Sequence, residues 1–87
     1  MALFLGLVSI RDSAVNAFMR PFAVPAIGAA TRAFTDDVNN PQSESHKHPE
    51  DYELYHVGDW DEDSGTFRPI EVPELIVRGK DCIKSVN

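Results

Sequence analysis

Residues 52–60 have the sequence YELYHVGDW, and the acidic stretch DEDSG follows at residues 61–65. Side chains of this first segment alternate, with Tyr52, Leu54 and His56 on one side and Glu53, Tyr55 and Val57 on the other. Such alternation in an aromatic-rich segment predicts a β-strand. Residues 66–72, TFRPIEV, supply its partner, and Gly65 lies near the tight point of the hairpin. Pro69 has no backbone N–H, which makes the partner an edge strand.

The segment that follows Pro25 changes period. Its apolar residues recur at steps of three and four, which places them on one stripe of an α-helix. The stripe consists of Ile27, Ala30, Phe34 and Val38. Several alanines favour the helix, and the sequence Asn39-Asn40-Pro41 is a stop signal. The pattern therefore predicts a helix over residues 26–39.

Residues 3–11 form a nearly continuous apolar run of strand length. Continuous hydrophobicity is typical of a central strand that is covered on both faces. Asp12 and Ser13 can cap a helix, so we expect a short helical turn over residues 14–18. Residues 20–24 have Pro21 and Pro25 at their ends and are expected to form an edge strand or an extended connection. Residues 41–47 are polar and are expected to form a mobile surface loop.

The 87 residues are sufficient for one small domain, residues 1–87, with a core at about residues 3–77. Residues 80–87, including the single cysteine Cys82, are expected to form a weakly ordered tail. The predicted fold class is α+β, with a small, mainly antiparallel sheet and one principal α-helix packed on one face. A domain of this size has a limited core, so a homodimer is one way to cover leftover apolar surface.

The formal net charge is −6, and the acidic residues lie mainly in the second half of the chain. Non-specific DNA binding depends on many Lys and Arg contacts with phosphates, so the balance argues against a DNA-coating protein. A single cysteine provides no disulfide framework, which suits a reducing compartment. The apolar residues 2–8 are far fewer than the roughly 20 that span a bilayer and lack the basic segment of a signal peptide. We expect a cytoplasmic protein that makes no membrane contact.

Catalytic and metal-binding patterns are weak. The sequence has no nucleophile elbow and no glycine-rich phosphate loop, so we predict neither an enzyme nor a cofactor. His46 and His48 share one side of an extended segment, and Glu50 or Asp51 is a conceivable further ligand. A zinc site needs about four ligands of fixed geometry, and we expect these histidines to be solvated and no metal to bind. A calcium loop counted from Asp59 requires Gly at its sixth position and Glu at its twelfth, where this sequence has Ser64 and Ile70.

The hairpin is the predicted partner-binding region. Trp60 leads into the acidic turn, and it either remains exposed at a protein contact or folds back over the hairpin. The candidate partner-binding residues are Tyr55, Asp59, Trp60, Asp61, Glu62 and Asp63.

Several short motifs together resemble one family. They are Ser9-Ile10-Arg11-Asp12, Arg32-Ala33-Phe34-Thr35-Asp36 with Val38-Asn39, Pro49-Glu50-Asp51-Tyr52 with Leu54-Tyr55, and Val57-Gly58-Asp59-Trp60-Asp61 with Ser64-Gly65. Their order and spacing resemble the small nonstructural protein of gokushoviruses, single-stranded-DNA phages of the Microviridae. The resemblance covers roughly two thirds of the chain. It implies a protein of the infected bacterium's cytoplasm that acts in viral genome replication, at the switch to single-stranded progeny DNA. It supplies no catalytic residues.

Three functional hypotheses follow. In the first, a non-enzymatic accessory protein binds a replication or packaging protein of the phage or host, and its acidic hairpin steers a basic partner surface. In the second, the chain is a capsid-assembly or scaffolding module. In the third, it binds single-stranded DNA through Arg11, Arg20 and Arg32 together with nearby Phe residues.

Overall fold

The computed structural model describes residues 4–84 and contains five strands and one long helix. In chain order the elements are β1 (Phe4–Asp12), β2 (Ala17–Phe18), β3 (Phe22–Val24), α1 (Ile27–Val38), α2 (Glu44–Lys47), the 3-10 helix η1 (Pro49–Asp51), β4 (Tyr52–Asp61), β5 (Thr66–Arg78) and the 3-10 helix η2 (Gly79–Asp81). The predicted hairpin and helix are both present, so these two sequence patterns were interpreted correctly.

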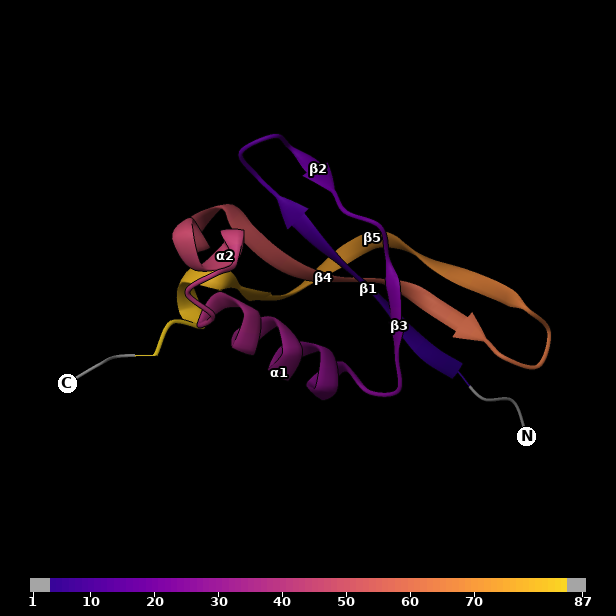
Figure 1. The fold of residues 1–87 in the computed structure, drawn as a ribbon. Helices are drawn as coiled ribbons and strands as arrows, with labels where there is room; N and C mark the ends of the chain where they lie inside the picture. The colour runs from indigo at the N-terminus through magenta and orange to yellow at the C-terminus, as the bar shows by residue number, and fades with distance from the viewer. Residues whose placement is uncertain (1–3, 85–87) are drawn as a thin grey trace.

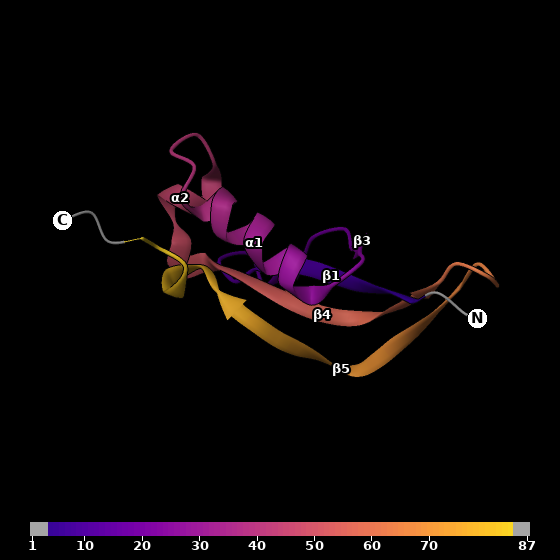
Figure 2. The same ribbon diagram turned by 90° about the horizontal axis from the view of Figure 1, so that it is seen from below.

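All five strands belong to one antiparallel sheet with the order β2-β1-β4-β5, and β3 also pairs with β1 (Figure 1). β5 lies at an edge, as Pro69 predicted, and the short strand β3 is also an edge strand. The sheet is curled, and viewed from below α1 lies over β1 and β4 while β5 runs apart from it (Figure 2). The chain therefore has an α+β fold with a mainly antiparallel sheet and one main helix.

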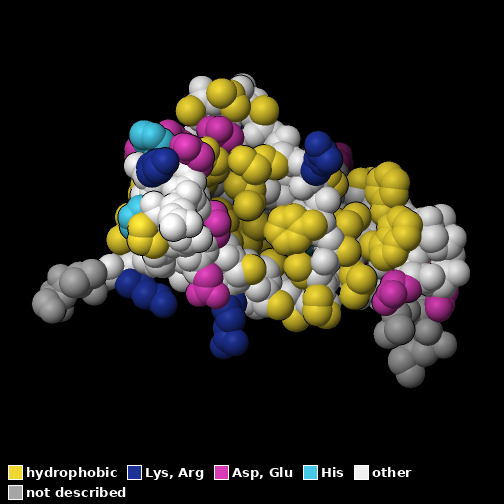
Figure 3. Space-filling model, viewed as in Figure 1, with side chains coloured by type: hydrophobic (Ala, Val, Ile, Leu, Met, Phe, Trp, Pro, Cys, Tyr) yellow, Lys and Arg dark blue, Asp and Glu magenta, His cyan; other side chains and the backbone are white. Residues whose placement is uncertain are grey.

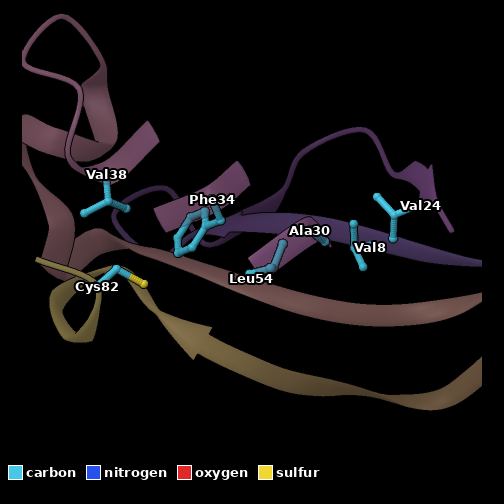
Figure 4. Close-up of a cluster of buried hydrophobic side chains, with 7 residues drawn as sticks. All are labelled: Val8, Val24, Ala30, Phe34, Val38, Leu54 and Cys82. Atoms are coloured by element: carbon cyan, nitrogen blue, oxygen red, sulfur yellow. The ribbon is translucent and has the colours of Figure 1, made fainter. Parts of the chain in front are cut away.

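Helix α1 contributes the predicted stripe to the core. Ala30, Phe34 and Val38 are buried, and they share one cluster with Val8 of β1 and Leu54 of β4 (Figure 4). The helix ends where the sequence predicted because Asn39 occupies its C-cap. The Asn39 side-chain amide donates hydrogen bonds to the carbonyl oxygens of Thr35 (2.8 Å) and Cys82 (2.9 Å). One side chain thus terminates the helix and ties it to the end of the chain.

The long strands are not regular. The pairing of β1 with β4 shifts between Leu7 and Val8, and that of β4 with β5 shifts on both sides of Tyr55–Val57. Val57 is left without a partner in either ladder, as in a β-bulge. Gly58 follows it, and a Cβ atom at this position would lie 2.6 Å from the carbonyl oxygen of Arg68. Only glycine permits the close approach of the two hairpin strands here.

The expected helical turn over residues 14–18 is wrong. The chain instead makes a turn at residues 13–16 and returns as β2, whose Phe18 pairs with Arg11. The carboxylate of Asp12 accepts a hydrogen bond from the N–H of Ala14, and Asn16 adopts a left-handed φ of 56°. Asp and Asn favour these turn conformations, so the same residues that suggested a helix cap form a hairpin turn.

Two polar segments are more structured than the sequence suggested. Residues 41–47 include α2, and the Ser43 hydroxyl caps it by accepting from the N–H of His46. Ser45 is buried and donates to the carboxylate of Asp37. Beyond β5, which continues to Arg78 rather than ending near residue 72, Cys82 is buried in the core. The folded core therefore extends past residue 77, and residues 85–87 of the expected tail lie outside the described residues.

Candidate interaction face

Successive residues of a strand point to opposite sides, so the strands that carry Val8 and Leu54 into the core also present a second side. β1 is covered on both faces at its middle, where the adjacent residues Val8 and Ser9 are both buried, but Leu5 and Leu7 nearer its start are only partly buried. Leu5 pairs with Trp60, and Trp60 pairs with Phe67 across the hairpin. We call this side the open face, and its side chains are those of Leu5, Leu7, Phe18, Tyr55, Val57, Trp60, Phe67 and Leu75.

Aromatic and aliphatic side chains dominate the open face. The rings of Phe18 and Tyr55 meet edge to face with centroids 5.2 Å apart. Phe18, Phe67 and Leu75 are 46%, 63% and 42% exposed, respectively. Figure 3, which has the view of Figure 1 with α1 below the sheet, shows hydrophobic side chains gathered in the middle of the visible surface and acidic side chains toward both ends. Large contiguous patches of exposed apolar surface are rare on monomeric proteins, and they often mark interaction sites.

A groove of about 310 Å³ crosses the open face near the hairpin. Its lining, which is almost wholly apolar, consists of Leu7, Pro21, Val57, Trp60, Phe67 and Pro69. The bulge at Val57 brings that side chain toward Trp60, and the indole forms one wall of the groove. Trp60 is therefore half-buried, intermediate between the two alternatives that its sequence position left open.

An ion-pair ladder occupies one end of the open face. The guanidinium of Arg11 lies 3.2 Å from the carboxylate of Glu53, and that of Arg78 lies 3.6 Å from the same carboxylate. The three residues are neighbours on β1, β4 and β5. Arg11 also donates to the side-chain oxygen of Asn16. Two arginines share one glutamate, so the ladder itself has a net charge of +1.

The acidic hairpin turn occupies the other end. Its residues Asp59, Asp61, Glu62 and Asp63 carry four negative charges. The Asp61 carboxylate accepts a hydrogen bond from the N–H of Asp63, and Gly65 closes the turn with a left-handed φ of 70°. Asp59 lies 3.2 Å from His56. Among the described residues, no Lys or Arg forms an ion pair with any of these four acids.

The candidate site residues lie in several places. Tyr55 and Trp60 lie on the open face. Glu62 and Asp63 lie in the turn at its hairpin end, whereas Asp59 and Asp61 flank Trp60 along β4 and point to the opposite side, where Asp59 meets His56. The three candidate arginines are on separate elements. Arg11 is in the ion-pair ladder, Arg20 is exposed between β2 and β3, and Arg32 lies on the exposed side of α1 beside Asp36. The sequence interpretation missed Phe18, Leu75 and Arg78, because their places on the face depend on which strands pair.

Outside the open face, two groups of polar residues are weaker candidate sites. One nitrogen of His48 and one oxygen each of Glu50 and Asp51 lie within 4.8 Å of one another on η1, the closest approach to a metal-ligand set in residues 4–84. His46 is turned away, with its Nδ1 2.9 Å from the carbonyl oxygen of Val38. Tyr52 lines a separate hollow between β1 and α2, and burial, followed by the nearby Asp12 carboxylate, raises the pKa of its hydroxyl.

No helix within residues 4–84 is both long and apolar enough to cross a membrane. Searches of curated proteins and of solved structures gave no match to this chain. A family model described as phage ORF5 protein matches residues 5–82, which include every strand and helix described above except Phe4, the first residue of β1. The chain therefore belongs to the phage ORF5 protein family.

Proposed function

We propose that this phage protein is a non-enzymatic accessory factor of viral genome replication, made in the cytoplasm of bacteria infected by gokushovirus-type phages of the Microviridae. It acts through protein–protein contacts at the switch to single-stranded progeny DNA. Membership of a phage protein family and the sequence motifs quoted above support this proposal. The observation that carries it is an acidic hairpin turn whose carboxylates form no ion pair with a Lys or Arg in residues 4–84, beside an exposed apolar face.

The charge of the hairpin defines the partner. Four carboxylates within five residues create a local negative potential, and a basic protein surface is its complement. Such complementarity chiefly raises the rate of encounter and the selectivity for a partner, and it weakens as salt screens the charges. The replication initiator of the phage and the helicase of the host are the partners we propose to test first.

The test is a pull-down of those two proteins at increasing salt concentration. Binding should fall with salt, and the double substitution Glu62→Gln with Asp63→Asn should weaken it about tenfold, because two rim charges of roughly 0.5–1 kcal/mol each are removed. The matched control is Glu71→Gln with Glu74→Gln, which removes the same charge from β5 instead of the turn. Failure of the wild-type chain to bind either protein at any salt concentration would contradict the proposal.

Two alternative functions make different predictions. A capsid-assembly or scaffolding module would be found in procapsids in stoichiometric amounts with the coat protein. A single-stranded-DNA binder would shift oligonucleotides, and the shift would vanish when Arg11, Arg20 and Arg32 become Ala. The sharing of Glu53 by Arg11 and Arg78 disfavours this last role, because the guanidinium of Arg11 is already paired.

A further inference from the structure

We propose that the open face binds a second copy of this chain, forming an antiparallel, face-to-face homodimer. The inference rests on the proposed function only in that it assigns the open face to protein–protein contacts. It deepens that function by naming the protein that first occupies the face. Three observations support it: the apolar character of the face, its size, and the opposite charges at its two ends.

The apolar surface of the open face is the first reason to expect a binding partner. Among the described residues, the buried hydrophobic core consists of Val8, Val24, Ala30, Phe34, Val38, Leu54 and Cys82. Large hydrophobic side chains that remain exposed include Phe18, Phe67 and Leu75 of the open face. Burying one such side chain contributes about 1.5–3 kcal/mol. These three side chains are already partly covered, so the gain for each is a fraction of that figure, and together they would contribute less than the seven buried core residues.

The size of the face matches a specific interface. β4 has ten residues, about 33 Å at 3.3 Å per residue, and the sheet is four strands wide, about 19 Å at 4.8 Å per strand. The footprint is therefore about 600 Å² per copy, or about 1,200 Å² for two copies. That total lies at the lower limit of stable protein–protein interfaces.

The charge distribution selects a second copy and fixes its orientation. A two-fold contact joins the same patch on both chains, and its axis lies between the two faces. An axis along the strands would place acidic turn on acidic turn. An axis across the strands reverses one copy end for end, so that the ladder of Arg11, Glu53 and Arg78 meets the partner's acidic turn at both ends. The face is complementary to itself only in this second arrangement.

Negative charge remains on the surface of the dimer and is available to the replication partner. Each turn brings Glu62 and Asp63 toward a ladder with a net charge of +1, so one negative charge of the turn stays uncompensated at each end of the dimer. Asp59 and Asp61 point to the opposite side of β4 and lie outside the contact. Tyr55 and Val57 lie near the middle of β4, so we place the two-fold axis close to them.

The test is the mass of the full chain in solution, measured by light scattering or sedimentation equilibrium. The wild-type chain should have twice its monomer mass of 9.7 kDa. Leu75→Glu introduces a charge in the middle of the face and should weaken the dimer at least about a hundredfold. Ile83→Glu is the control, because Ile83 is also an exposed apolar residue but lies beyond η2, and this variant should stay dimeric.

A charge exchange tests the orientation without relying on a core substitution. Arg78→Glu should weaken the dimer about tenfold by placing acid against the acidic turn. Adding Glu62→Arg should restore most of the affinity, because the turn of the partner copy then presents a cation to the carboxylate introduced at position 78. A wild-type chain that is monomeric at every concentration would overturn the dimer, and a charge exchange without rescue would overturn the antiparallel arrangement.

Two further outcomes separate this inference from others. A monomeric wild-type chain that still binds a replication protein would overturn the dimer and leave the proposed function intact. A dimer that binds no replication protein would support this inference while contradicting that function. A monomer whose Trp60 fluorescence is quenched by an oligothymidylate would instead assign the open face to single-stranded DNA.

Discussion

The two sides of the sheet differ in how far they are covered. Val8 of β1 and Leu54 of β4 are completely buried in the cluster that includes α1, whereas Phe67 and Leu75 of the edge strand β5, on the open face, are 63% and 42% exposed. Both sides carry large apolar side chains, so composition does not distinguish them. The difference is that the chain contains one long helix, which supplies a cover for only part of a curled sheet. A small domain of this kind leaves apolar surface that only another molecule can cover.

The largest expected effect separates the two sides directly. Leu54→Ala should lower the free energy of unfolding by about 3 kcal/mol, because it leaves a cavity among fully packed neighbours. Phe67→Ala should cost less than about 1 kcal/mol in the monomeric Leu75→Glu background, since its ring is mostly in solvent. Urea denaturation measures both. Equal costs would show that the open face is packed by the chain itself.

The hairpin geometry that shapes the groove can be disturbed at Gly58. Gly58→Ala should destabilise the chain by about 2 kcal/mol, because the new methyl group would meet the Arg68 carbonyl oxygen at 2.6 Å. Gly28→Ala is the control, since nothing lies within 4 Å of its Cβ position and α1 should gain about 0.5–1 kcal/mol. Thermal unfolding of both variants checks this. A neutral Gly58→Ala would mean that β4 and β5 approach less closely.

The covered side depends on one polar residue as well as on apolar ones. Asn39→Ala should cost about 1–2 kcal/mol, because the Cys82 carbonyl oxygen and the Lys84 N–H lose their Asn39 side-chain partners, while the Thr35 carbonyl oxygen keeps only the backbone N–H of residue 39. Asn40→Ala removes only a local turn contact with the N–H of Gln42 and should cost less than half as much. Amide hydrogen exchange should show faster exchange near Cys82 in the first variant alone. Unchanged exchange there would contradict the tie between α1 and the chain end.

The smallest expected effect is a titration. Tyr52 and Tyr55 are the two tyrosines, so Tyr55→Phe leaves Tyr52 as the sole phenol. Its pKa should lie above the ordinary value of 10.0, because burial and the Asp12 carboxylate disfavour the phenolate. The folded-state pKa is raised, so this contribution to stability is present below pH 10 and declines as the pH rises through the folded pKa. Absorbance at alkaline pH should show Asp12→Asn lowering that pKa.

The sequence predicted the elements whose signal lies within the element itself. The stripe of Ile27, Ala30, Phe34 and Val38 carries its own period, and the hairpin carries both its alternation and its turn. Segment 41–47 was missed because Ser45 is buried by a hydrogen bond to Asp37 rather than by apolar contacts. A hydrogen bond between polar residues that are separated in sequence leaves no periodic pattern in that sequence.

Only part of the candidate site could be predicted from the sequence, for a related reason. Trp60 and the acidic turn are adjacent in sequence, so their association was predicted. The ladder of Arg11, Glu53 and Arg78 depends on the pairing register, which the bulge at Val57 shifts. The apolar run of β1 also has the same sequence whether its second side is covered or open. Single-chain patterns therefore found the hairpin end of the face and missed its extent.

The fluorescence of Trp60, the single tryptophan, tests the open face most directly. Quenching by acrylamide should be strong in dilute protein, should decrease as the concentration rises and the dimer forms, and should remain strong for Leu75→Glu at every concentration. Quenching of the wild-type chain that is independent of concentration, and equal to that of Leu75→Glu, would contradict the account.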